Sequence, residues 1–296
     1  MPMELIKNLT ATLLFFLVGC TSNPFWEDKP SKKVKIEGYV FANEKVSDVS
    51  AFVYVEELNV FTYTDSSGYF SIDLLNLESE VGNFSGSVRV FYYLHNYKVA
   101  YSTLLITNGR LTGSQTDFDE YGTLIEPVIL QKLLSLELSI NNVWDRSNAD
   151  SLRFSLTLMS HDEPVSFLSY VNVLSAPRRY VPSGILLKSN QNDAVYFDEN
   201  DADLIQRTDL NSNNILQLEY NVSPNGFLPF VIDDYISLEQ QLVQNGSHLI
   251  LPYVFIIQEN IPQKILSSMG ISNAQNISAE HFTMPIDMVL KTIFIQ

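Results

Sequence analysis

Short segments in which apolar and polar residues alternate recur along most of this 296-residue chain, and turn-forming residues separate them. Val34–Phe41, Leu133–Ile140 and Leu152–Leu158 alternate most clearly. A period of two places successive side chains on opposite faces of a strand, so that one face is buried and the other meets solvent. The pattern predicts an all-β fold.

The chain contains a single cysteine, Cys20. An intrachain disulfide, a CxxC redox pair and an iron–sulfur cluster each need more than one, so none can form. The core must therefore be held by side-chain packing, and a chain that is 46% hydrophobic has the apolar residues to supply it.

Cys20 follows an apolar run, Leu13-Leu-Phe-Phe-Leu-Val18, and the small residue Gly19. The run is too short to span a hydrocarbon core of ~30 Å, which takes about 20 apolar residues in a helix. Together with Lys7 in a short amino-terminal region, it predicts that residues 1–19 are a secretory leader that is removed.

The stretch Leu17-Val18-Gly19-Cys20 resembles the lipobox of bacterial lipoproteins. The resemblance implies that Cys20 is the lipidation site, carrying long acyl chains such as palmitate, and that it anchors the protein in the lipid bilayer of the cell envelope. Each buried CH₂ contributes about 0.8 kcal/mol, so two or three chains hold firmly. Thr21 rather than Asp follows the cysteine, which favours the outer membrane. The alternative is an ordinary leader with a chance cysteine.

Residues 20–33 contain two prolines and no period, and they are expected to be a tether. Residues 34–130 are expected to form the first domain. Its predicted strands are Val34–Phe41, Val49–Val55, Val60–Thr64, Tyr69–Leu74, Ser87–Tyr93, Tyr97–Ile106 and Thr123–Leu130. About seven strands at this spacing indicate a sandwich.

Three pieces of this domain carry a resemblance: Ile36-Glu-Gly-Tyr-Val40, Val49-Ser-Ala-Phe-Val53 and Thr64-Asp-Ser-Ser-Gly-Tyr-Phe70. Together they are similar to the carboxypeptidase regulatory-like domain, a transthyretin-like seven-stranded sandwich. Its usual Gly-Pro-like turn is absent from residues 43–48, and a plain hairpin in another sandwich is the alternative. Domains of this family bear no catalytic residues, so the resemblance implies a spacer, folding partner or adhesion module.

Residues 131–296 are expected to form a second β-rich domain, with an immunoglobulin-like sandwich as the favoured architecture. Helices are expected at Ile232–Val243, where Asp233 and Asp234 suit a first turn, and at Ile261–Met269. Strands are expected at the alternating segments Leu133–Ile140 and Leu152–Leu158. Further strands are expected at Val165–Leu174, Tyr180–Leu187, Ile215–Val222, Leu249–Ile257 and Met288–Ile295.

The formal net charge of −16 argues against a nucleic-acid partner, because phosphate backbones would be repelled. HExxH, GxSxG and phosphate-binding loop motifs do not occur, so we expect no catalytic residues, no cofactor and no metal ligands. Each histidine is expected to be exposed or at a strand edge. These are His95, His161, His248 and His281.

Two further features leave alternatives open. The acidic segment Asp198–Asp203 could supply oxygen ligands to Ca²⁺, although it fails the EF-hand pattern and is more simply a solvated loop. The aromatic cluster Phe91-Tyr92-Tyr93, with Tyr97 and Tyr101, could stack on sugar rings if some members point outward, or pack within the sheet.

The sequence thus favours a non-catalytic, lipid-anchored envelope protein that acts in binding, scaffolding or adhesion. Its partner would be an envelope protein or a polysaccharide. One alternative is a carbohydrate-binding surface lipoprotein. Another is an envelope enzyme with its site in the second domain.

Overall fold

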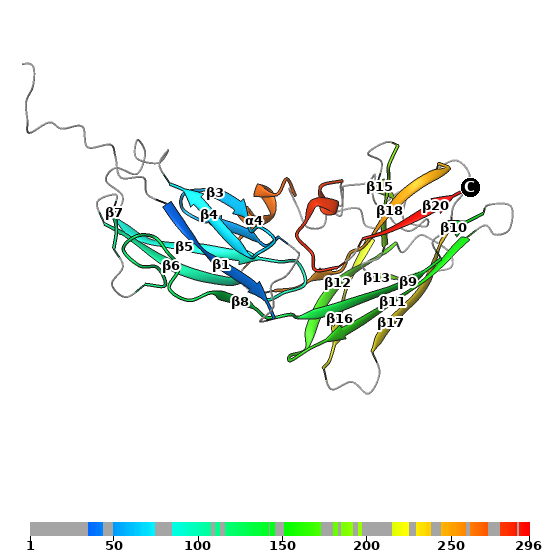
Figure 1. Ribbon diagram of the computed structural model, residues 1–296. Helices are drawn as coiled ribbons and strands as arrows, with labels where there is room; N and C mark the ends of the chain where they lie inside the picture. The colour runs from blue at the N-terminus through cyan, green and yellow to red at the C-terminus, as the bar shows by residue number, and fades with distance from the viewer. Residues whose placement is uncertain are drawn as a thin grey trace, which may run out of the picture.

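The computed structural model is nearly all-β, which confirms the predicted fold class. It describes residues 35–43, 50–74, 85–107, 110–112, 116–141, 143–145, 151–172, 180–182, 185–191, 195–196, 215–224, 229–237, 244–258, 261–271, 279–288 and 290–296. The strands within residues 35–130, labelled β1 to β8, gather at one end of the molecule, and those within residues 134–295, labelled β9 to β20, at the other (Figure 1).

Strands β1 to β8 form two facing sheets. One is ordered β4-β1-β8, with bounds Tyr69–Asp73, Lys35–Ala42 and Val128–Leu130. The other is ordered β3-β2-β5-β6-β7, with bounds Val60–Tyr63, Phe52–Val55, Gly86–Tyr93, Ala100–Thr107 and Arg110–Leu111. The described part of this sandwich has one strand more than the seven expected, because the two-residue strand β7 pairs with the end of β6.

The predicted alternation explains which face of β1 is buried. Ile36, Val40 and Ala42 of β1 point into the core between the two sheets, whereas the residues at odd positions point away from it. Phe70 and Ile72 of β4 join them, because β4 pairs with β1 in antiparallel register. Burial of such side chains stabilises a fold by about 1.5–3 kcal/mol each.

The second group of strands forms three sheets. A three-stranded sheet is ordered β17-β11-β9, with bounds Phe230–Ser237, Ser151–Ser160 and Leu134–Ile140. A second sheet contains β13 (Tyr180–Pro182), β12 (Val165–Asn172) and β16 (Ile215–Val222), and β19 (Phe255–Ile256) also pairs with β12. The third is ordered β10-β20-β18-β14-β15, with bounds Val143–Trp144, Lys291–Ile295, Gly246–Pro252, Ile185–Ser189 and Val195–Tyr196.

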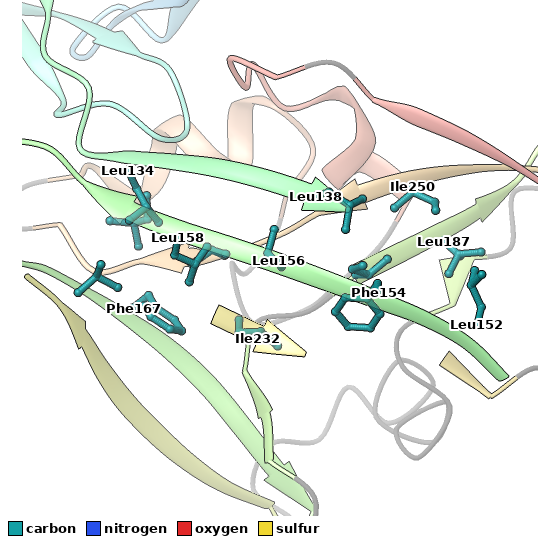
Figure 2. Packing of buried hydrophobic residues seen from close by; sticks show 14 of the residues in the cluster. Leu134, Leu138, Leu152, Phe154, Leu156, Leu158, Phe167, Leu187, Ile232 and Ile250 are labelled. Atoms are coloured by element: carbon teal, nitrogen blue, oxygen red, sulfur yellow. The ribbon is translucent and has the colours of Figure 1, made fainter. Parts of the chain in front are cut away.

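The long strand β11 is the centre of this second core. Leu152, Phe154, Leu156 and Leu158 alternate along it and are all buried (Figure 2). They pack among side chains from neighbouring strands, including Leu134, Leu138, Phe167, Leu187, Ile232 and Ile250. The alternation read from the sequence is therefore the pattern that builds this core.

The helix expected over Ile232–Val243 is wrong within the described residues. Residues Phe230–Ser237 form β17, which pairs antiparallel with β11 over eight positions. Ile232 is buried between exposed neighbours, as a strand requires. The two aspartates that suggested a helix start lie in this strand, whose ladder of hydrogen bonds outweighs a weak local preference. The short helix expected at Ile261–Met269 is confirmed as α4 (Gln263–Ser268).

A third apolar cluster joins the two groups of strands. Phe52, Tyr54, Phe91 and Tyr93 leave the five-stranded sheet on the face opposite the first core. They pack against residues from β14, β18, α4 and the segment around the 3₁₀ helix η3 (Ala279–Thr283), among them Leu186, Leu251, Tyr253, Ile265 and Met284. These four side chains, which would otherwise face solvent, are thus covered by β14 and by the C-terminal part of the chain.

The turn between β5 and β6, residues 94–99, adds polar contacts to this apolar one. We call these contacts between the two groups of strands the joint. The backbone N–H of His95 donates to the carbonyl of Pro285 at 2.7 Å, and its Nε2 lies 2.9 Å from the carbonyl of Val254. Asn96 donates through Nδ2 to the carbonyl of Leu134 at 3.1 Å. One short turn therefore holds three segments that are remote in the sequence.

The joint also contains an ion pair. Asp287 accepts hydrogen bonds on Oδ2 from the Tyr97 hydroxyl at 2.5 Å and from Lys132 Nζ at 2.9 Å. Lys132 lies between β8 and β9, where the chain passes from one group of strands to the other. The carboxylate of Asp287 therefore ties the C-terminal segment to that connection.

Candidate ligand-binding site

The one site residue predicted from the sequence, Cys20, lies outside the described residues, as do the leader 1–19 and the tether 20–33. The acidic segment Asp198–Asp203 also lies outside them. Within the described ranges, His, Asp and Glu side chains nowhere gather in a group of three that could hold a metal ion. No helix in those ranges is long and apolar enough to cross a membrane.

The predicted aromatic cluster does not form one exposed patch. Tyr92 and Tyr97 are buried in the first core, and Phe91 and Tyr93 are buried on the opposite face. Only Tyr101 is well exposed, at 58%. The packing alternative is therefore confirmed for four of the five residues, and Tyr92 cannot serve as a stacking platform for a sugar.

Three of the four histidines are buried, so the expectation that each is exposed or at a strand edge is wrong for these three. His95, His248 and His281 are each less than 5% exposed. His161 is exposed and lies 2.8 Å from the hydroxyl of Ser135. Burial of His95 follows from tertiary contacts with residues near position 254, which no local pattern predicts.

A different group of aromatic side chains lies on the outer face of β1 and β4. Tyr39 and Tyr69 are directly opposite each other in the antiparallel register, and their ring centroids are 5.4 Å apart. Phe41, two residues further along β1, stacks on Tyr39 at 6.0 Å with an interplanar angle of 28°. Tyr39 remains 45% exposed. We call these three residues the aromatic platform.

Charged and polar groups flank the aromatic platform on one side. The hydroxyl of Tyr69 donates to Glu37 Oε2 at 2.6 Å, and Lys35 Nζ donates to the Tyr69 hydroxyl at 3.3 Å. Lys35 Nζ also lies 2.5 Å from Glu37 Oε2. The hydrogen bond with Glu37, and to a smaller extent the one with Tyr69, raises the pKa of Lys35. The hydrogen bonds from Lys35 and Tyr69 lower the pKa of Glu37. Both groups are therefore charged at neutral pH.

Local sequence explains why these side chains share one face. Residues 35, 37, 39 and 41 are the odd positions of β1, opposite in direction to the buried even positions. Phe41 also passes over the turn before β4, where a Cβ built at Gly68 would lie 3.2 Å from the Phe41 ring. On its other side Phe41 is opposite Ile129 of β8, which is 48% exposed.

The arrangement suits a ligand with both an apolar face and hydroxyl groups. An exposed aromatic ring presents apolar area at low entropic cost, and Tyr adds a polar group at its edge. Glu37 offers carboxylate oxygens that accept hydrogen bonds, and Lys35 offers ammonium donors. A sugar ring combines an apolar C–H face with hydroxyl donors and acceptors, so it matches both parts of the surface.

Sequence reasoning placed Tyr39 and Phe41 in a strand without identifying them as site residues. The signal was present, because both occupy the positions of β1 that alternate with buried ones. What the sequence did not reveal is that Tyr69 lies beside them, 30 residues later in the chain. Their proximity depends on the antiparallel register of β1 and β4.

A scan of the chain against protein-family models finds no match. No curated protein matches it either. Among solved structures, the chain is similar to a DUF3823 family protein from Bacteroides ovatus, with 11% sequence identity and a TM-score of 0.27. The alignment covers 76% of this chain and 96% of that one.

Proposed function

We propose that this chain is a non-catalytic, lipid-anchored protein of the bacterial cell envelope that binds carbohydrate on the aromatic platform. The lipid anchor would be the acylated Cys20, and the outer membrane is the expected location because Thr21 follows it. The remaining expectations of the sequence, a spacer or adhesion role in a carboxypeptidase regulatory-like domain, are compatible with this activity.

The observation that carries the proposal is the contact between Tyr39 and Tyr69 beside Glu37. The hydrogen bond from Tyr69 to Glu37 fixes the carboxylate at the edge of the platform. The exposed ring of Tyr39 therefore lies next to an oriented acceptor without a conformational change. Preorganisation of this kind reduces the entropy lost on binding, so modest contacts can give measurable affinity.

A glycan array probed with the mature chain tests the carbohydrate proposal. We expect binding to one class of glycan, and we expect Tyr39→Ala to weaken it about tenfold, or about 1.4 kcal/mol. Tyr101→Ala is the matched control, since Tyr101 is exposed at 58% on the other sheet. Absence of glycan binding, or equal losses in the two variants, would contradict the proposal.

The lipid anchor is tested separately in the native host. Mass spectrometry of the purified protein should show a chain that begins at Cys20 and carries acyl groups, and Cys20→Ser should release the protein from membranes. An uncut leader or an unmodified thiol would refute the anchor. Because the platform lies on β1 and β4, glycan binding by the mature chain does not depend on that result.

A further inference from the structure

A second surface, on the other group of strands, has the features of a binding site. It is a hollow of about 490 Å³ over β9, β11 and β17. Ligand sites are typically about 300–1,000 Å³ and carry a few placed polar groups. The side chains that matter here are polar: Ser139, Asn141, Arg153, Ser155 and Asp233.

The strand registers explain the shape of this hollow. Ser155 of β11 is directly opposite Ser139 on one neighbouring strand and Asp233 on the other. The three therefore form one row across the outer face of the sheet. Arg153 and Asp233, whose side chains are longer than serine, also line the hollow.

Arg153 and Asp233 have opposite charges and stand on adjacent strands. Asp233 pairs in register with Ser155, two residues from Arg153, so the two charged residues are diagonal neighbours. Diagonal positions are about 7–8 Å apart, within reach of long side chains. Among the described residues, however, the ion pairs within 4.0 Å involve neither of them. Both charged residues line the hollow, where a ligand would meet them.

We propose that this hollow binds a short zwitterionic peptide. The guanidinium of Arg153 would bind the terminal carboxylate through two parallel N–H groups, a geometry that matches a carboxylate. The carboxylate of Asp233 would bind the terminal ammonium. Ser139, Ser155 and Asn141 would hydrogen-bond the peptide group between the two termini.

Size and charge complementarity favour a dipeptide. An extended dipeptide spans about 7 Å, which corresponds to the spacing of diagonal strand positions. A zwitterionic ligand places an opposite charge at both Arg153 and Asp233. This activity goes beyond the carbohydrate proposal and uses different residues on different strands.

Calorimetry with the mature chain and three ligands tests the inference. Alanyl-alanine should bind. N-acetyl-alanyl-alanine lacks the ammonium, and alanyl-alanine amide lacks the carboxylate, so each should bind about tenfold more weakly. Equal affinity for all three ligands would overturn the proposal, as would no heat from alanyl-alanine at millimolar concentration.

Variants connect each ligand charge to its residue. Asp233→Asn should weaken alanyl-alanine about tenfold while leaving the N-acetyl ligand unchanged, and Arg153→Gln should leave the amide ligand unchanged. Glu137→Gln is the matched control, because Glu137 is an exposed carboxylate of β9 that does not line the hollow. If Asp233→Asn weakens the free and the acetylated ligand equally, the assignment of the ammonium to Asp233 is wrong. Circular dichroism melts establish that each variant is folded.

Discussion

Gly68 and Gly122 end two turns on either side of β1, and each accepts a backbone hydrogen bond from that strand. The N–H of Val40 donates to the carbonyl of Gly68 at 2.9 Å, and the N–H of Glu37 donates to the carbonyl of Gly122 at 2.9 Å. Both glycines have positive φ, +80° and +88°. Strand β1, which carries two of the three residues of the aromatic platform, is thus hydrogen-bonded to a turn on each side.

The two turns share one sequence pattern, Asp-x-x-Gly. In each, the aspartate side chain accepts from the backbone N–H groups two and four residues further on, at 2.8 and 3.0 Å for Asp65 and at 2.9 and 2.8 Å for Asp119. The N–H of the glycine donates to the aspartate carbonyl in both. Aspartate favours such turns because its side chain can bond the local backbone.

Gly68→Ala and Gly122→Ala should each lower the free energy of unfolding by at least about 1–3 kcal/mol. A Cβ would lie 2.5 Å from the carbonyl oxygen of Val40 in the first case and 2.0 Å from that of Lys35 in the second, in addition to the strain of positive φ. Urea denaturation measures both. Ser66→Ala, an exposed change in the first turn, should cost almost nothing. Equal effects at Ser66 and Gly68 would disprove this account.

Gly38→Ala should destabilise the sandwich by about 1–3 kcal/mol through overpacking. Its Cβ would lie 2.5 Å from the Cβ of Leu124, the buried residue that follows the second turn. Because the clash is with a Cβ, Leu124→Ala should not relieve it, whereas Leu124→Gly should. A double-mutant cycle by denaturation tests this, and additive costs with Leu124→Gly would exclude the contact.

Stability should fall as the pH drops from about 6.5 to 4, because of His95. Burial lowers the pKa of this imidazole to about 4, although its bond to the Val254 carbonyl acts in the opposite direction. As the pH falls, the unfolded state therefore binds a proton at a higher pH than the folded state does. The contribution of His95 to the free energy of unfolding is fully present above its unfolded pKa of 6.5 and is lost as the pH falls toward its folded pKa of about 4.

The expected loss from this group is up to about 3 kcal/mol. His95→Gln should be less stable at pH 7 and should flatten the pH dependence between 4 and 6.5, measured by chemical denaturation. His161→Gln is the control, because His161 is exposed. An unchanged slope in His95→Gln would show that this residue does not govern the pH response.

Asp287→Asn should cost about 1.5–3 kcal/mol at neutral pH, since hydrogen bonds to a charged group are of this size. Burial raises the pKa of Asp287, but the bonds from Tyr97 and Lys132 outweigh it and hold that pKa below its usual value. The stabilisation is therefore present above the unfolded pKa of 3.8 and lost as the pH falls through the lower folded pKa.

The pairing with Lys132 can be isolated by a cycle. Lys132→Met and Asp287→Asn should show a coupling of about 1 kcal/mol, because the two atoms are 2.9 Å apart and both side chains are mostly buried. Lys98→Met with Glu163→Gln offers the exposed comparison, which should couple weakly. Equal coupling in both pairs would contradict a special role for the joint.

Local pattern predicted much of the fold. Alternation placed β1, β4, β9 and β11 within a residue or two of their bounds, because one buried face imposes a period of two. The turn at Asp65–Gly68 is local in the same sense, since the hydrogen bonds that close it join only its own residues and the next. The turn at Asp119–Gly122 has the same Asp-x-x-Gly signal and the same local hydrogen bonds.

The sequence by itself determined the all-β class, the faces of the strands and the absence of disulfides, because each follows from neighbouring residues or from a count. Only the tertiary structure decided which strands meet. It placed Tyr69 beside Tyr39, Asp233 beside Ser155 and His95 against Val254. These contacts join residues 30 to 159 positions apart, and their register depends on the packing of whole sheets rather than on any local preference.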